Sequence, residues 1–164
     1  MAWSLREILG DRPGLRALAR RVAGIAWEGP QTSLGAANLA LQLLQRNVEA
    51  IRRERGRIFV ELRGVGAVSL GYFVFWGTVD SRFVRVNPSN KEHEYGHALQ
   101  SRMLGPAYLL VVGVPSVLRV AYANMQWFVT RQPWEGYYDG FPESWADRLG
   151  GVVRPRGGAT ASST

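Results

Sequence analysis

The stretch SNKEHEYGHALQSRMLGP, residues 89–106, predicts a single helix and carries the most informative pattern in the chain. Ser89 suits the N-cap position, and Glu92 three residues later completes a capping box. The Gly-Pro pair at the end of the stretch predicts that the helix stops at about Leu104, because glycine is favoured just past a helix end and proline cannot continue the helix.

The only two histidines of the chain, His93 and His97, lie on this predicted helix in the order H-E-x-x-H. Residues four apart share a helix face, so the two imidazoles can bind one zinc ion. Glu94 can then act as general base on a zinc-bound water. Gly96 costs the helix about 1 kcal/mol relative to alanine, which makes sense if backbone or substrate passes close by. The alternative is a chance match on a solvated helix.

A zinc site of this kind needs a third protein ligand, and the best candidate lies in the stretch FPESWADRLGG, residues 141–151. Its proline suits the first position of a short helix and its glycine pair suits the end. Glu143 and Asp147 are four residues apart, so one carboxylate could bind the metal while the other accepts the outer N–H of a zinc-bound imidazole. Alternatively, both belong to a solvated face, with Asp147 paired to Arg148 or Arg131.

These two motifs together resemble the gluzincin, or thermolysin-like, branch of the zinc metallopeptidases. The resemblance covers only residues 89–104 and 141–150, and it implies that His93, His97 and Glu143 are the zinc ligands. It also implies that Glu94 is the general base and that Asp147 lies behind a histidine ligand. The string HEYGH, with the residues after it, also resembles short bacterial HExxH domains.

The family usually adds a histidine or tyrosine that stabilises the developing oxyanion. With both histidines used as ligands, the nearest candidates are Tyr137 and Tyr138, just before the second motif. A tyrosine hydroxyl can serve this role, and we assign it to Tyr138. The alternative is that the two rings simply pack at a loop edge.

Composition limits the remaining possibilities. With 164 residues and 46% hydrophobic residues, the chain fits one folded domain, which we expect over residues 1–153, followed by a disordered tail over 154–164. The absence of cysteine excludes disulfides and thiolate zinc sites. The formal net charge of +7 is spread along the chain without a nucleic-acid-binding motif, so nucleic acid is an unlikely partner.

Hydrophobic periodicity predicts two helices before a small sheet. The first helix would span Pro13 to Trp27 with an apolar stripe facing the core, although its arginines could also place it on an anionic membrane. The remaining predicted elements are a helix from about Ser33 to Arg53 and strands at Arg57 to Leu62, within Gly64 to Thr78, and at Arg82 to Val86. An edge strand of this sheet could hold an extended peptide substrate.

The segment over residues 103–130 carries one charge, that of Arg119. Core packing is the preferred interpretation, because Gly113 and Pro115 break the apolar run before it reaches the length of a spanning helix. The alternative is a surface that meets a membrane or a hydrophobic partner.

The sequence therefore predicts an α+β, zincin-like domain that binds one Zn²⁺ and hydrolyses peptide bonds in a peptide or protein substrate. The alternative is a non-catalytic binding protein of the same fold, associated with a membrane or partner through the apolar segment. No secretory signal is evident in residues 1–21, which favours the cytoplasm.

Overall fold

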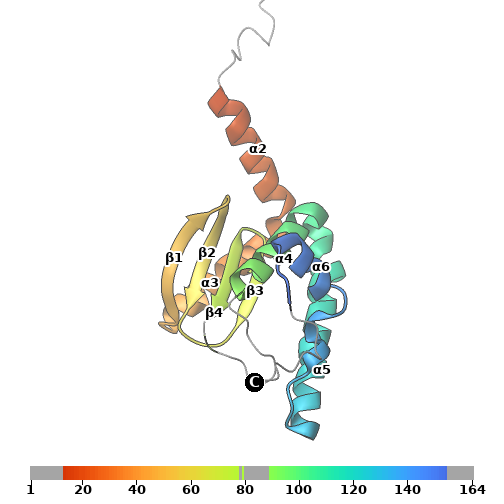
Figure 1. Cartoon of the computed structure of the whole chain (residues 1–164). Coiled ribbons are helices and arrows are strands. Elements are labelled where there is room, and N and C mark those ends of the chain that lie inside the picture. Colours follow the sequence, from red (N-terminus) through yellow and green to blue (C-terminus); the bar gives the residue numbers. More distant parts are fainter. Residues whose placement is uncertain (1–12, 78, 80–88, 155–164) are drawn as a thin grey trace, which may run out of the picture.

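The mixed α+β architecture expected from the sequence is present in the computed structural model, which describes residues 13–77, 79 and 89–154 (Figure 1). In chain order its main elements are α2 (Pro13–Trp27), α3 (Gly29–Leu44), β1 (Val48–Glu54), β2 (Arg57–Leu62), β3 (Ala67–Leu70), β4 (Phe73–Gly77), α4 (Asn90–Leu104), α5 (Val114–Thr130) and α6 (Glu143–Gly150). Three short helical turns complete it: η1 (Gly105–Ala107), η2 (Leu109–Gly113) and η3 (Glu135–Tyr138).

The four strands form one mixed sheet in the order β1-β2-β4-β3. The two hairpins, β1–β2 and β3–β4, are antiparallel, while β2 and β4 pair in parallel at the centre. The β1–β2 turn places Arg55 and Gly56 both at positive φ, the conformation that matches the twist of a two-residue hairpin. The central strands are rich in aromatic and β-branched residues because both of their faces are covered.

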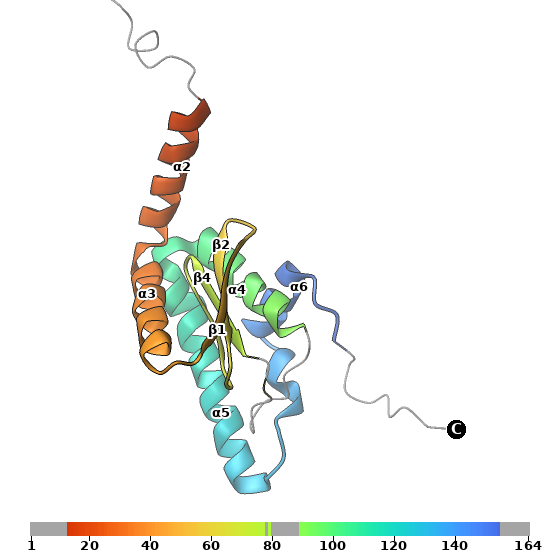
Figure 2. The same cartoon turned by 90° about the vertical axis from the view of Figure 1, so that its left-hand side faces the viewer.

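Helices cover the two faces of the sheet. Helix α3 packs on one face and α4 on the other, with α6 beside α4 (Figure 2). The side chains alternate accordingly: Phe59, Val74 and Trp76 form a core with Ala98 of α4. The intervening positions of the same two strands face α3, where a second core contains Val60, Leu62, Phe73 and Phe75 with Leu39 packed against it. Because α4 is anchored on the sheet, its opposite side is free to meet α6.

The predicted extent of the second helix was wrong. The second helix ends at Leu44 instead of reaching Arg53, and residues 48–54 form strand β1. The helix ends where Arg46 adopts a φ of 55° and the main-chain N–H of Asn47 bonds back to the main-chain oxygen of Gln42. The Asn47 side-chain amide then donates to Gln42 and accepts from the main-chain N–H of Gly64, next to the start of the hairpin. The predicted strand at residues 82–86 lies outside the described residues, as does all but the first residue of the predicted tail.

The first helix has the predicted bounds, but the described side chains of its apolar stripe do not face the core. Leu18 and Val22 are exposed. Both views show α2 extending away from the sheet (Figures 1 and 2). Its contact with the remainder of the chain is near its C-terminal end, where Trp27 packs over Gly105.

The preferred core interpretation of residues 103–130 was also wrong. One face of η2 and α5 contacts the domain through residues such as Val112 and Ala123, which are buried. The other face is apolar and open to solvent, with exposed fractions of 73% for Leu110, 63% for Leu118 and 79% for Val129. In the described part of the chain, Leu109–Thr130 is the one helix whose length and composition would allow it to cross a membrane.

Candidate metal centre

The H-E-x-x-H helix forms as predicted, although the capping box does not. Ser89 is the N-cap residue of α4, but its side chain makes no capping hydrogen bond. Glu92 instead accepts two hydrogen bonds from Arg55 of the β1–β2 turn, so a tertiary ion pair replaces the local cap. The helix ends at Gly105 with φ 53°, a left-handed conformation that favours glycine. His93 and His97 are both buried on one side of this helix.

Helix α6 brings the predicted acidic residues to the same side. Pro142 is the N-cap residue rather than the first helical residue, and Gly151 ends the helix in a left-handed conformation. The two helices approach closely: a Cβ atom at Gly96 would lie 2.0 Å from the main-chain oxygen of Ala146. A Cβ atom at Gly150 would lie similarly close to the main-chain oxygen of Glu92. The expectation that backbone passes next to Gly96 is therefore confirmed.

The three predicted ligand side chains converge. Glu143 Oε2 lies 3.0 Å from Nε2 of His93 and 3.0 Å from Nε2 of His97. One ligand atom from each of the three residues lies within 4.8 Å of the other two, and all three residues are buried. Ligand atoms that share a tetrahedral zinc ion lie about 3.3 Å apart, so the spacing fits a single metal ion.

The outer nitrogens of both imidazoles point to hydrogen-bond acceptors. His93 Nδ1 donates to Asp147 Oδ1 at 2.7 Å, and His97 Nδ1 donates to Gln100 Oε1 at 2.7 Å. In a neutral imidazole this leaves the lone pair on Nε2, which is the atom that faces Glu143. Two lone pairs and a carboxylate directed at one another repel unless a proton or a cation lies between them. The residues present therefore fit a divalent metal ion.

Electrostatic interactions agree with this arrangement. Burial opposes protonation of His93, but hydrogen bonds with Asp147 and Glu143 outweigh that effect and raise its pKa to about 9. Burial acts to raise the pKa of Glu143, yet the two histidines lower it well below the usual range. Asp147 also has a lowered pKa, because hydrogen bonds from His93 and Arg154 outweigh its desolvation. The site thus favours anionic carboxylates around a positive charge.

Glu94 lies beside the cluster and does not belong to it. It is buried, and burial raises the pKa of its carboxyl group despite the nearby histidines. Ser69 Oγ, on the edge strand β3, lies 3.0 Å from Glu94 Oε2 and also bonds to the main-chain oxygen of Glu94. A carboxylate with a raised pKa that is held in place beside a metal-binding group suits a general base.

The two tyrosines flank the centre. The ring of Tyr138 meets that of His93 edge to face, with centroids 5.1 Å apart. Tyr137 is buried and packs against Tyr138. Burial raises the pKa of both phenols, so they keep the proton that a hydrogen-bond donor needs. The structure thus brings Tyr138 to the site, and its role with substrate stays a prediction.

Several partners of the site residues were not found by sequence reasoning. Ser116 of α5 donates a 2.7 Å hydrogen bond to Glu143 Oε1, and Arg154 binds both oxygens of Asp147. Gln100 joins the two helices by accepting from His97 and donating to the main-chain oxygen of Pro142. The alternatives considered for Asp147, namely pairs with Arg131 or Arg148, are replaced by this pair with Arg154. Of these partners, only Gln100 could have been found from the sequence, because its position places it on the same side of α4 as the two histidines.

Comparison of the chain with models of protein families, with curated proteins and with solved structures gives no match.

Proposed function

We propose that the chain is a zinc-dependent peptidase with a zincin-like arrangement of α4, α6 and the edge strand β3. The observation that carries the proposal is the convergence of two imidazole Nε2 atoms and one carboxylate oxygen within hydrogen-bond distance, with Glu94 beside them. Three protein ligands of these types leave a fourth position of a tetrahedral metal free for water or substrate, as in catalytic zinc sites.

His93, His97 and Glu143 would hold a zinc ion, which when bound would act as a Lewis acid toward a water molecule and a carbonyl group. The protein residues supply the remaining steps. Glu94 accepts the proton of the attacking water and passes it to the leaving amine, and its raised pKa suits both transfers. Ser69 holds the Glu94 carboxylate in place, while Tyr138 can donate a hydrogen bond to the substrate oxygen.

The edge strand supports a peptide as substrate. Within the described residues, strand β3 pairs only with β4, and it carries the serine that contacts Glu94. Its main-chain groups on the other side are placed to pair with an extended peptide, except that the Ser69 carbonyl accepts a 2.9 Å hydrogen bond from Tyr108. A peptide would therefore add along the start of β3, next to residues 67 and 68.

The experiment that tests this proposal compares the zinc-loaded protein with its Glu94→Gln variant on a peptide library. We expect Glu94→Gln to bind zinc as tightly as the parent and to lose turnover by a factor of roughly 10³, since the amide keeps the shape but cannot accept the proton. Glu92→Gln is the matched control, because Glu92 is a partly exposed carboxylate on the same helix and pairs with Arg55. Equal turnover in parent and Glu94→Gln would remove Glu94 as the base, and absence of turnover in the parent would remove the peptidase assignment.

A second candidate function is favoured by the exposed apolar face of η2 and α5. A surface of this kind suits attachment to a membrane, with or without catalysis at the metal centre. Co-sedimentation with vesicles of neutral phosphatidylcholine tests it, with Leu118→Gln combined with Phe128→Gln as the variant. Both residues are exposed, so the fold should survive, and vesicle binding that is unchanged in this variant would reject α5 as the attachment surface.

A further inference from the structure

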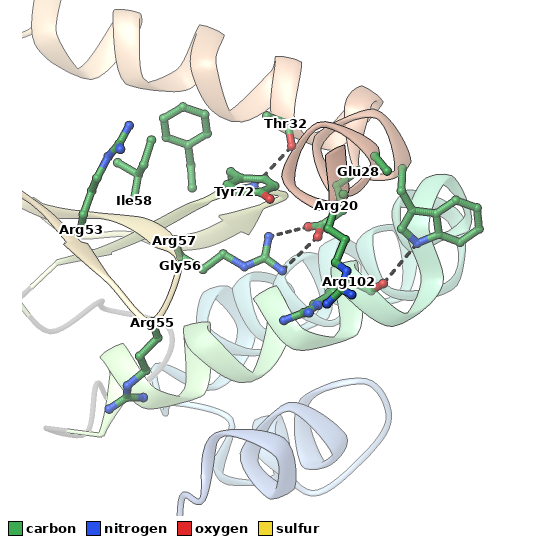
Figure 3. A pocket seen from close by; sticks show the side chains of 14 residues that line it. Arg20, Glu28, Thr32, Arg53, Arg55, Gly56, Arg57, Ile58, Tyr72 and Arg102 are labelled. Carbon is green, nitrogen blue, oxygen red and sulfur yellow. Dashed lines mark hydrogen bonds and ion pairs between the residues drawn. The ribbon is translucent and has the colours of Figure 1, made fainter. Parts of the chain in front are cut away.

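A pocket of about 860 Å³ lies where the end of α2, the β1–β2 hairpin and the end of α4 meet (Figure 3). It is on the side of α4 that faces away from α6, so it is separate from the metal centre. Five arginines from α2, the β1–β2 hairpin and α4 line it: Arg20, Arg53, Arg55, Arg57 and Arg102. Glu28 is the one carboxylate in the lining.

Glu28 is already committed to a partner. Its two oxygens accept hydrogen bonds from Arg57 at 2.6 and 3.0 Å, and both side chains of this ion pair are buried. Ser101 donates a further hydrogen bond to Glu28 Oε2. The same two terminal nitrogens of Arg57 also donate to the main-chain oxygens of Gly71 and Ala98. The charges of Glu28 and Arg57 cancel at the base of the pocket. Glu28 therefore does not neutralise the other arginines.

Three of the arginines remain without a carboxylate. Arg55 is paired with Glu92 and points away from the pocket toward the start of α4 (Figure 3). Arg20, Arg53 and Arg102 make no ion pair within the described residues. All three residues are exposed at the pocket, so their guanidinium groups are accessible to an anionic ligand, which would balance their charge. Figure 3 draws Arg20 and Arg102 at one end of the pocket and Arg53 at the other.

The rest of the lining is apolar or aromatic. Trp27, Ile58, Tyr72 and Phe73 line the pocket, and Figure 3 shows Ile58 beside Arg53 and Tyr72 nearer to Arg20. Two of these side chains are held in place: the Trp27 indole donates to the main-chain oxygen of Arg102 at 3.1 Å, and the Tyr72 ring lies 4.9 Å from the Arg57 guanidinium. The pocket therefore combines unpaired cations with fixed flat surfaces, which suits a ligand that is anionic at one end and apolar at the other.

We propose that this pocket binds a phosphate monoester whose organic part is apolar or aromatic. Arg20 and Arg102 hold the phosphate, because a planar guanidinium donates two parallel hydrogen bonds to phosphate oxygens and two such groups match a dianion better than a monoanion. Trp27, Ile58 and Phe73 contact the organic part. Such a group can be a soluble phosphorylated molecule or the headgroup of phosphatidic acid in a membrane.

The test uses the full chain and measures binding of 1-naphthyl phosphate by calorimetry. The variant is Arg20→Gln with Arg102→Gln, and the matched control is Arg52→Gln with Arg63→Gln, which removes the same charge from exposed arginines outside the pocket. We expect the first pair to weaken binding roughly tenfold or more and the second pair to leave it within about twofold. Zinc content and peptide hydrolysis play no part in this readout, so the outcome is independent of the proposed function.

Three results would overturn the proposal: no binding of 1-naphthyl phosphate to the parent, equal losses in the two double variants, or equally tight binding of 1-naphthoate. The source of the phosphate is then decided with vesicles. An increase in co-sedimentation when phosphatidic acid is added to phosphatidylcholine vesicles, lost in Arg20→Gln with Arg102→Gln, identifies the lipid. Binding of the soluble ester without this lipid-dependent co-sedimentation identifies a soluble ligand.

Discussion

Ser116 Oγ donates a 2.7 Å hydrogen bond to Glu143 Oε1, the carboxylate oxygen that does not face the two histidines. The serine belongs to α5, whose opposite face is apolar and exposed, and the glutamate begins α6. The hydrogen bond fixes the rotation of the carboxylate, so that Oε2 stays 3.0 Å from each imidazole. Helix α5 is thus part of the metal centre as well as part of the surface.

Replacing Ser116 by alanine should weaken zinc binding roughly tenfold, because hydrogen bonds that orient metal ligands contribute about that much to affinity. Competition with a fluorescent zinc chelator measures the change. Ser116→Thr keeps the hydroxyl and should restore affinity, and Ser144→Ala removes a hydroxyl from α6 itself and should have no effect. An unchanged affinity in Ser116→Ala would show that Glu143 needs no support from α5.

The two carboxylates of α6 should have different effects on zinc. Glu143→Ala removes a ligand and should abolish near-stoichiometric zinc content, as measured by elemental analysis of the purified protein. Asp147→Asn should retain zinc with roughly tenfold lower affinity, because the amide oxygen can still accept from His93 but loses its charge and its pairing with Arg154. Asp139→Asn, at an exposed carboxylate after η3, is the control. Full zinc content in Glu143→Ala would contradict the assigned ligand set.

The metal-free protein should lose stability as the pH rises. The pKa of His93 is about 9 in the folded chain, above its ordinary value of 6.5, so its contribution is fully present below about pH 6.5 and is lost as the pH rises through 9. Thermal unfolding with a chelator present should show Tm falling across this range. A flat or rising Tm would contradict the proton-bridged arrangement of His93 with Asp147 and Glu143. The zinc-loaded protein is the control, since a bound metal requires the neutral imidazole and removes this dependence.

Gly96→Ala should destabilise the protein by about 1–3 kcal/mol and weaken zinc binding. The added methyl would lie 2.0 Å from the Ala146 carbonyl oxygen, so α6 must move away and carry Glu143 and Asp147 with it. Denaturant unfolding and zinc competition measure the two effects. Gly113→Ala is the matched control: its methyl meets only ordinary contacts near 4 Å, and alanine should stabilise the helical segment slightly. A stabilised Gly96→Ala would contradict the tight contact.

The sequence predicted the parts of the site that depend on local spacing. The i, i+4 pairs His93/His97 and Glu143/Asp147 lie on the predicted helices, and Gly96 has the close neighbour that its helix cost indicated. Other contacts could not be predicted because they join distant segments. Ser69 reaches Glu94 from 25 residues away, and Ser116 reaches Glu143 from 27 residues away. No periodicity in a single segment encodes such a pair.

The two wrong predictions, the extent of α3 and the burial of residues 103–130, also depended on contacts between distant segments. The apolar spacing of α3 continues into β1, while the chain leaves the helix at Arg46, which adopts a φ of 55°, and at Asn47, which contacts Gly64 just after β2. In α5 the apolar positions surround most of the helix, so composition favoured burial. The domain covers only the face of α5 that carries Ser116, Arg119 and Ala123. Which face is covered depends on where the neighbouring loops lie, and this information is not contained in the sequence of α5.

A metal ion at this centre would also be a cross-link. His97 and Glu143 are 46 residues apart, and the chain contains no cysteine with which to close a loop of that size covalently. In the chain-entropy model, closing such a loop lowers the conformational entropy of the unfolded chain, which stabilises the folded state by about 4 kcal/mol. Everything between the two ligands, including α5 and its exposed face, lies inside that loop. Removing the metal would open this loop, which contains α5. The ion would therefore serve this protein as a reversible counterpart of a disulfide.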